Sequence, residues 1–147
     1  MLQLNCTNNL LNTLMSTDLL QTIRQTYPDF VFKSAQKFSF RPPRTILFVQ
    51  DDPNFDSLLL HELGHALLNH SNFITNIERL KMERAAWDKA LEIAQSLNLA
   101  IDENLIEAEL DTYRNWLHIK SRCQKCGLTR YQTRDGRYHC PHCDLQN

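Results

Sequence analysis

The sequence has little of what would mark a fibrous, membrane-spanning or secreted chain. Three glycines and five prolines among 147 residues exclude a collagen-like or low-complexity composition. No apolar run reaches the roughly 20 residues that a bilayer-spanning helix requires. No Lys or Arg precedes Arg24, so the charged start of a signal peptide is lacking. These absences predict a soluble, cytoplasmic protein with no membrane partner.

Cysteine is also scarce, and its spacing is more informative than its number. Of five cysteines, Cys6 stands alone, while Cys123/Cys126 and Cys140/Cys143 form two Cys-x-x-Cys pairs. An odd count in a chain without a signal peptide argues against a disulfide framework. We expect Cys6 to act as a small hydrophobic residue that is buried or half-buried, with no reactive role. The two pairs, separated by 13 residues that include a hairpin-like Asp-Gly, predict a zinc ribbon with one structural zinc ion.

The charge of the chain is unevenly distributed. Residues 1–119 carry 10 Lys and Arg against 15 Asp and Glu, whereas residues 120–147 carry 6 against 2. A basic tail suits nucleic acid or an acidic protein, but four thiolates around Zn²⁺ add a net charge of about −2. The ribbon is therefore only mildly basic, and we favour a structural or substrate-docking role over contact with nucleic acid.

Periodicity in the rest of the chain predicts an α+β fold. Three short aromatic and β-branched runs indicate a small antiparallel sheet, and four amphipathic runs indicate helices. The expected strands are residues 29–33, 37–40 and 45–50; the expected helices are residues 8–27, 54–70, 76–98 and 102–118. Because the composition changes to Cys, Arg and Gly near residue 119, we expect two domains, 1–118 and 119–147.

Two of these helices have recognisable start signals. Asp52-Pro53 predicts a start by an Asp cap with Pro at the first helical position. Thr75 and Glu78, three residues apart, form the pattern of a capping box. The capping box accounts for Glu78 without any chemistry.

The second expected helix contains the motif HELGH at residues 61–65. Residues four apart lean to one side of a helix, so His61 and His65 suit two ligands of a tetrahedral zinc ion. Glu62 lies beside them, placed to accept a proton from water rather than to bind the metal. The alternative is an amphipathic helix whose histidines match by chance. However, Gly64 costs about 1 kcal/mol relative to Ala in a helix interior, which indicates a close packing partner.

The third expected helix carries a carboxylate on its apolar face. Glu83 lies in the stripe that includes Leu80 and Trp87, where an ionised group is unfavourable unless a positive charge meets it. Zinc catalysis needs a third protein ligand, and Glu83 would supply it if the two helices pack antiparallel. The alternative is a buried salt bridge, for example to Arg79.

Several further residues are candidates for supporting roles. His70 follows His65 by five residues without an intervening glycine, so the metzincin spacing fails. We interpret His70 as a surface residue or a neighbour of a ligand. His70 and Tyr113 are the two candidates for stabilising a transition-state oxyanion. We expect the strand over residues 45–50 to be an edge on which an extended substrate pairs.

The motif HELGHALL followed by the helix ERAAWDKA resembles the ImmA/IrrE-like metallopeptidases of phages, integrative elements and stress-response systems. The resemblance covers about residues 15–118 and implies a zincin-like minimal peptidase fold. It also implies that His61, His65 and Glu83 bind catalytic zinc and that Glu62 is the catalytic base. The expected substrate is a helix-turn-helix repressor, so the enzyme would act as an anti-repressor. In the family, the residue directly after Glu-x-x-Ala is more often Asn or Asp, with Phe two residues later. Here that residue is Trp87.

Two alternatives remain open. SprT-like proteases, which act on DNA-associated proteins, also join an HExxH domain to a zinc ribbon, but they use a third His in place of Glu83. A non-enzymatic adaptor with two zinc ions, binding protein or nucleic acid, would have no need of the base Glu62.

Overall fold

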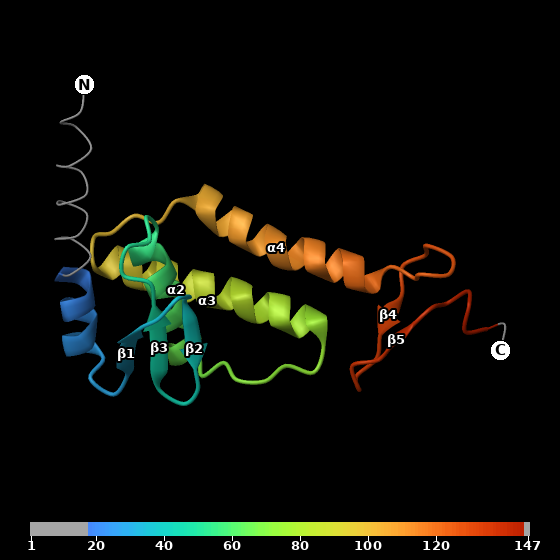
Figure 1. Cartoon of the computed structure of the whole chain (residues 1–147), viewed down its shortest axis with the longest axis horizontal. Helices are drawn as coiled ribbons and strands as arrows, with labels where there is room; N and C mark the ends of the chain where they lie inside the picture. The colour runs from blue at the N-terminus through green and yellow to red at the C-terminus, as the bar shows by residue number, and fades with distance from the viewer. Residues whose placement is uncertain (1–17, 146–147) are drawn as a thin grey trace, which may run out of the picture.

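The computed structural model describes residues 18–145, so Cys6 and the start of the first expected helix lie outside the described residues. The fold is α+β, as predicted (Figure 1). A helix over residues 18–26 precedes the other elements. These are β1 (Val31–Ser34), β2 (Ser39–Arg41), β3 (Thr45–Phe48), α2 (Phe55–Leu67), α3 (Asn76–Ser96), α4 (Glu103–Ser121), β4 (Tyr131–Gln132) and β5 (Tyr138–His139). None of the helices within residues 18–145 is long and apolar enough to cross a membrane.

The three-stranded sheet differs from the expected one in two respects. Its strand order is β1-β3-β2, and β3 pairs parallel with β1 but antiparallel with β2. The sheet is therefore mixed rather than antiparallel, and the strand predicted to be an edge is the central one. The physical reason lies in Ile46, Leu47 and Phe48, which are all buried. A strand with such a continuous apolar run needs cover that only the middle of a sheet provides.

Of the two predicted helix-start signals, the one at α3 is confirmed and the one at α2 is wrong. At α3 the Thr75 side chain accepts from the Glu78 N–H while the Glu78 carboxylate accepts from the Thr75 N–H, which confirms the capping box. Asp102 caps α4 by accepting from the Asn104 N–H, and α4 begins at Glu103, one residue after the expected start. Asp52 instead accepts from the Asn54 N–H at 2.8 Å and closes a turn. Helix α2 therefore begins only at Phe55.

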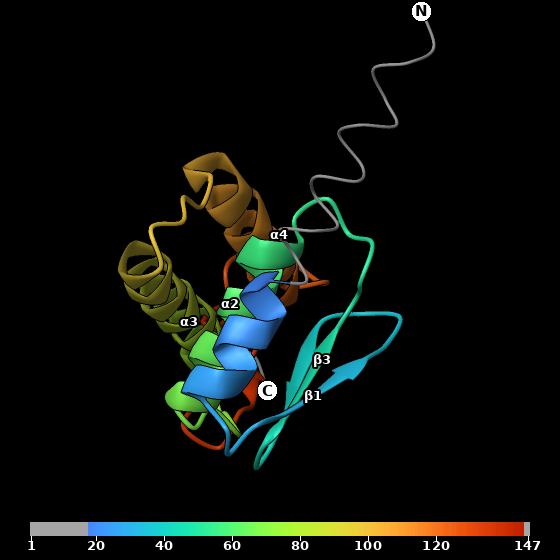
Figure 2. The ribbon, with the colours of Figure 1, turned by 90° about the vertical axis from the view of Figure 1, so that its left-hand side faces the viewer.

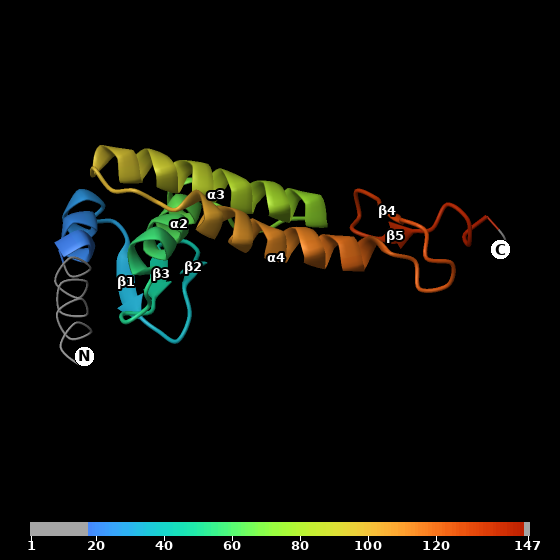
Figure 3. The same ribbon diagram turned by 90° about the horizontal axis from the view of Figure 1, so that it is seen from above.

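Helix α2 is the centre of the molecule. It lies between the sheet and α3 (Figure 2), and α4 runs alongside α3 (Figure 3). Phe55, Leu59 and Leu63 on α2 are almost fully buried, as is Trp87 on α3. The layering covers α2 on two sides, so any polar residue on the α3-facing side of α2 is held in the core.

The cysteine-rich segment follows α4 directly. Helix α4 continues to Ser121, three residues past the expected domain boundary. Beyond it, the short antiparallel pair of β4 and β5 lies at the opposite end of the molecule from β1 (Figure 1).

Candidate metal centres

Three polar side chains from two helices meet between α2 and α3. The Nε2 atoms of His61 and His65 lie 3.1 Å apart. The Oε2 atom of Glu83 lies 3.2 Å from the first and 3.3 Å from the second. His61 and Glu83 are the polar residues that the core of residues 18–145 buries, at 7% and 8% exposure. The structure therefore brings together the three ligands expected from the sequence.

The spacing of these donors suits a tetrahedral cation. Ligand atoms about 2.0–2.1 Å from a tetrahedral zinc ion lie about 3.4 Å from one another, close to the separations of 3.1–3.3 Å observed here. Two imidazoles and one carboxylate are also a donor set that zinc uses in hydrolases. This group can therefore bind a metal ion.

Gly64 sets the distance between the two helices. A Cβ atom at this position would lie 2.4 Å from the carbonyl oxygen of Ala86 on α3. A side chain would therefore force the two backbones apart. The close packing partner predicted from this glycine is confirmed, and the close approach is what lets Glu83 reach both imidazoles.

Hydrogen bonding controls the charge of Glu83. Burial acts to raise the pKa of its carboxyl group, but the hydrogen bonds to His61 and His65 outweigh burial and lower the pKa to about 2. Burial also lowers the pKa of His61, which favours the neutral imidazole that a metal requires. Within the described residues, Glu83 and Arg79 make no ion pair, so the alternative partner expected from the sequence is not the one observed.

Glu62 points to a different neighbour from those of Glu83. Its Oε2 atom accepts a hydrogen bond of 2.6 Å from the Phe40 N–H on β2. Burial raises the pKa of Glu62 to about 7, against the lowering effects of His65 and the Phe40 bond. Because β2 is an edge of the sheet, Glu62 lies where the edge strand and α2 meet. Nothing in the sequence pointed to Phe40, since the contact spans 22 residues and uses only a backbone group.

The two imidazoles are oriented by different neighbours. The ring of His61 lies 4.3 Å from that of Trp87, tilted by 30°, and its Nδ1 atom is buried without a hydrogen-bond partner among the described residues. The Nδ1 atom of His65 lies 2.9 Å from Nδ1 of His70. Since Nε2 of His65 faces Glu83, His70 sits behind the ring, away from the ligand group.

Tyr113, on α4, lies close to Glu83. Burial and the nearby Glu83 carboxylate raise the pKa of its hydroxyl to about 12, while Arg79 acts in the opposite direction. Of the two candidates for stabilising an oxyanion, Tyr113 is therefore the one beside the ligand group. The hydroxyl keeps its proton at neutral pH and remains a hydrogen-bond donor.

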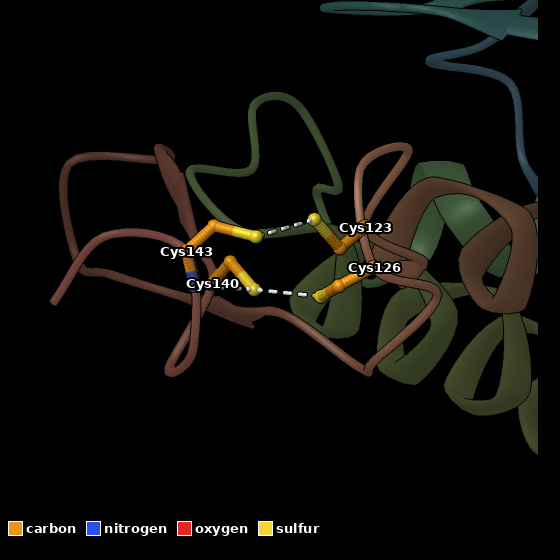
Figure 4. Close-up of side chains that lie close together, drawn as sticks. All are labelled: Cys123, Cys126, Cys140 and Cys143. Carbon is orange, nitrogen blue, oxygen red and sulfur yellow. Dashed lines mark hydrogen bonds between the residues drawn. The ribbon is translucent and has the colours of Figure 1, made fainter. Parts of the chain in front are cut away.

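The four cysteines of the C-terminal segment form the second cluster. The Sγ atoms of Cys123 and Cys143 lie 3.9 Å apart, and those of Cys126 and Cys140 lie 3.5 Å apart (Figure 4). Four sulfurs about 2.3 Å from a tetrahedral zinc ion lie about 3.8 Å from one another. Backbone N–H groups that donate to Cys123 lower the pKa of its thiol to about 6, which favours the thiolate. This cluster can also bind a metal ion.

The ribbon is docked onto the start of α3. The Oε1 atom of Gln132 accepts a hydrogen bond of 2.7 Å from the Asn76 N–H, and the Asn76 side chain donates to the Tyr138 hydroxyl at 2.8 Å. A Cβ atom on Gly136 would lie 3.2 Å from the carbonyl oxygen of Ile74. The β4–β5 hairpin therefore rests on the segment that connects α2 to α3.

No known family model, curated protein or solved structure matches the chain. The resemblance to ImmA/IrrE-like metallopeptidases therefore stays a prediction from residues 61–68 and 83–90.

Proposed function

We propose that the chain is a zinc-dependent endopeptidase in which His61, His65 and Glu83 hold the catalytic ion and Glu62 is the general base. The observation that carries this proposal is the group of three donor atoms at coordination spacing, with a fourth polar residue next to it whose hydrogen bond goes elsewhere. That fourth residue, Glu62, is directed toward an edge strand instead.

The ion and the chain would have separate roles. When bound, zinc supplies Lewis acidity, polarising a carbonyl group and lowering the pKa of water toward neutrality. Glu62, with a pKa of about 7, is suited to take a proton from water and to deliver it to the leaving amine near neutral pH. Tyr113 is placed to donate a hydrogen bond to the developing oxyanion.

The outer edge of β2 is the surface on which we expect the substrate to lie. An extended segment that pairs with an edge strand gains main-chain hydrogen bonds, and β2 passes directly over Glu62 at Phe40. This replaces β3, which is central and has no free edge. The substrate would be a protein with an exposed extended segment, cut within that segment.

The resemblance narrows the substrate to a helix-turn-helix repressor of a phage or mobile element. Cleavage would relieve repression. The C-terminal ribbon would hold a second, structural zinc ion and would support the active-site helices by its contacts with Asn76.

The two alternatives are less well supported. A SprT-like peptidase needs a third His ligand, but His70 contacts the rear of the His65 ring rather than the ligand group. An adaptor that only binds zinc would gain nothing from a buried Glu62 with a raised pKa, because burial of that carboxyl group is a cost to folding.

The test is co-expression of the chain with each helix-turn-helix repressor encoded near its gene. Wild type should convert one full-length repressor into defined fragments, and Glu62→Gln should leave it intact, because the amide preserves packing but cannot accept the proton. Loss of the repressor with both versions, or with neither, would contradict the proposed reaction or the proposed substrate. Glu62→Gln must still bind two zinc ions per chain, which shows that its site is assembled.

A further inference from the structure

Arg79 is held by three aromatic rings next to the proposed active site. Its guanidinium carbon lies 5.4 Å from the centroid of Phe73, 5.1 Å from that of Tyr113 and 5.3 Å from that of Trp116. These rings come from the segment before α3 and from α4. A cation over a ring face is attracted by the ring quadrupole, so the rings fix the position of the guanidinium without neutralising its charge.

The charge of Arg79 has no acidic partner among residues 18–145. Other arginines of the same helical pair do have one. Arg84 contacts Asp88 and Glu107, whereas Arg79 makes no ion pair with any carboxylate of the described residues. A guanidinium has five N–H donors in a rigid fork that matches a carboxylate. Arg79 is therefore a cation held in a fixed position, and the described residues do not supply the carboxylate that it would bind.

Arg79 also lies close to the ligand group. It is four residues, or about one helical turn, before Glu83 on α3. Tyr113, whose ring lies under the guanidinium, is the residue proposed above to stabilise the oxyanion. The guanidinium therefore lies against the proposed oxyanion donor and about one helical turn from a proposed metal ligand, a distance of roughly two residues of an extended substrate.

We propose that Arg79 is a specificity-determining residue that binds a carboxylate of the substrate close to the bond that is cut. This proposal rests on the proposed peptidase function and deepens it by naming the chemistry of the substrate. The carboxylate belongs to an Asp or Glu side chain of an extended segment. A bidentate pair with Arg79 would hold that segment in one register over Glu62.

Binding and cleavage test the proposal separately. The first probes are two dipeptide hydroxamates that differ only in Glu or Gln next to the hydroxamate, titrated into the full-length, zinc-loaded protein. A third probe carries a C-terminal carboxylate in place of the acidic side chain. Wild type should bind the Glu compound about tenfold more tightly than the Gln compound, as expected for one charge-assisted pair. If wild type preferred only the third probe, Arg79 would bind the C-terminal carboxylate of a chain rather than an acidic side chain, and the proposal would be overturned.

The substitutions are chosen to separate specificity from folding. Arg79→Gln should abolish the preference for the Glu compound, and Arg79→Lys should retain part of it. Arg79→Glu should instead prefer a fourth probe, a hydroxamate with Lys in place of Glu. If the role of Arg79 were purely structural, its substitutions would weaken the binding of all probes equally. The matched control is Arg84→Glu, an identical change of charge on the exposed face of α3, which should keep the wild-type preference.

The second measurement is the pattern of cuts in a peptide library prepared from a digested proteome. Wild type should cut next to Asp or Glu, Arg79→Glu should cut next to Lys or Arg, and Glu62→Gln should cut nothing. Cutting without any acidic preference would overturn the role of Arg79 and leave the peptidase intact. Absence of both cutting and hydroxamate binding by wild type would overturn the peptidase and, with it, this proposal.

Discussion

Glu83 shows how one buried carboxylate can be accommodated. A charged group in a core is strongly unfavourable unless hydrogen bonds or opposite charges compensate for it. Here two imidazoles from the neighbouring helix provide the hydrogen bonds, and they hold the pKa of Glu83 near 2 in spite of burial. Glu62, only one residue from His61, has the opposite shift. The two carboxyl groups therefore differ in the role that they suit. Glu83 stays ionised, as a metal ligand must, whereas Glu62 can take up a proton near neutral pH, as a base must.

Removal of the Glu83 carboxylate should cost the protein its catalytic zinc ion. Glu83→Gln and Glu83→Leu should each reduce the zinc content of the protein from two ions per chain to one, measured by elemental analysis. The amide preserves the packing, and the metal-free Leu variant should be at least as stable as metal-free wild type because the imidazoles left behind can stay neutral. Glu78→Gln is the control on the same helix; because Gln at this position also completes a capping box, it should change stability little and lose no metal. Full zinc content in both Glu83 variants would exclude Glu83 as a ligand.

Trp87 is a second residue whose role depends on its neighbours. At the position where the resembled family more often has Asn or Asp, this ring stacks on His61. An Asn side chain could accept a hydrogen bond from an imidazole, whereas an indole orients the ring by its face alone. This accounts for the absence of a hydrogen-bond partner for Nδ1 of His61 among the described residues.

At the scale of elements, the pairing of α2 with α3 is what assembles the site. The antiparallel approach expected from the sequence requires the two backbones to be close at one point. Gly64 and the Ala86 carbonyl provide that point, and Ala86 lies three residues after Glu83 on α3. The helices would otherwise be held apart by their side chains.

The element-scale prediction is therefore that Gly64→Ala will destabilise the protein. Alanine favours a helix by about 1 kcal/mol, but the new methyl group would meet a backbone oxygen that cannot rotate away, and such overpacking costs about 1–3 kcal/mol. We expect a net loss in the free energy of unfolding of metal-free protein, with weaker binding of the catalytic ion. Urea denaturation and zinc titration measure the two effects.

The control is Ala108→Gly on the exposed face of α4. It should lose about 1 kcal/mol through helix propensity alone and leave zinc affinity unchanged. If Gly64→Ala were more stable than wild type and bound zinc normally, the close approach of α2 and α3 would not be a constraint.

At the scale of the whole molecule, two groups of residues that could each bind a metal ion are connected through α3. The His and Glu group lies between α2 and α3, and the segment that carries the cysteine cluster lies beyond the end of α4 (Figure 1). The ribbon contacts the start of α3 through Gln132 and Tyr138. Loading of the ribbon should therefore stabilise the same segment that leads from His70 to α3.

The prediction at this scale is that a chelator will remove two zinc ions in two phases. The ion held by His61, His65 and Glu83 should leave first, because an open coordination position admits the chelator, whereas four thiolates close the shell of the other. A coloured chelator measures both phases. Glu83→Gln should lack the fast phase and Cys143→Ser should alter only the slow phase. A single ion, held only by the cysteines, would rule out the proposed enzyme.

Features that depend on neighbours within a few residues were determined by the sequence alone. The capping box at Thr75, the facing imidazoles of residues 61–65 and the two cysteine pairs are of this kind, because helix periodicity and turn chemistry act over one or two turns. The apolar stripe around Glu83 also predicted a partner for that carboxylate on an adjacent helix. Burial supplied the reason for Glu83, since a polar group in a core must be matched.

Tertiary structure decided what depends on residues far apart in the chain. The order of strands put β3 in the middle and β2 at the edge, and only that order brings the Phe40 N–H to Glu62. The position of His70 behind His65, and the enclosure of Arg79 by rings from two elements, likewise follow from packing between segments. Local periodicity states which face of an element is apolar, but not which other element covers that face.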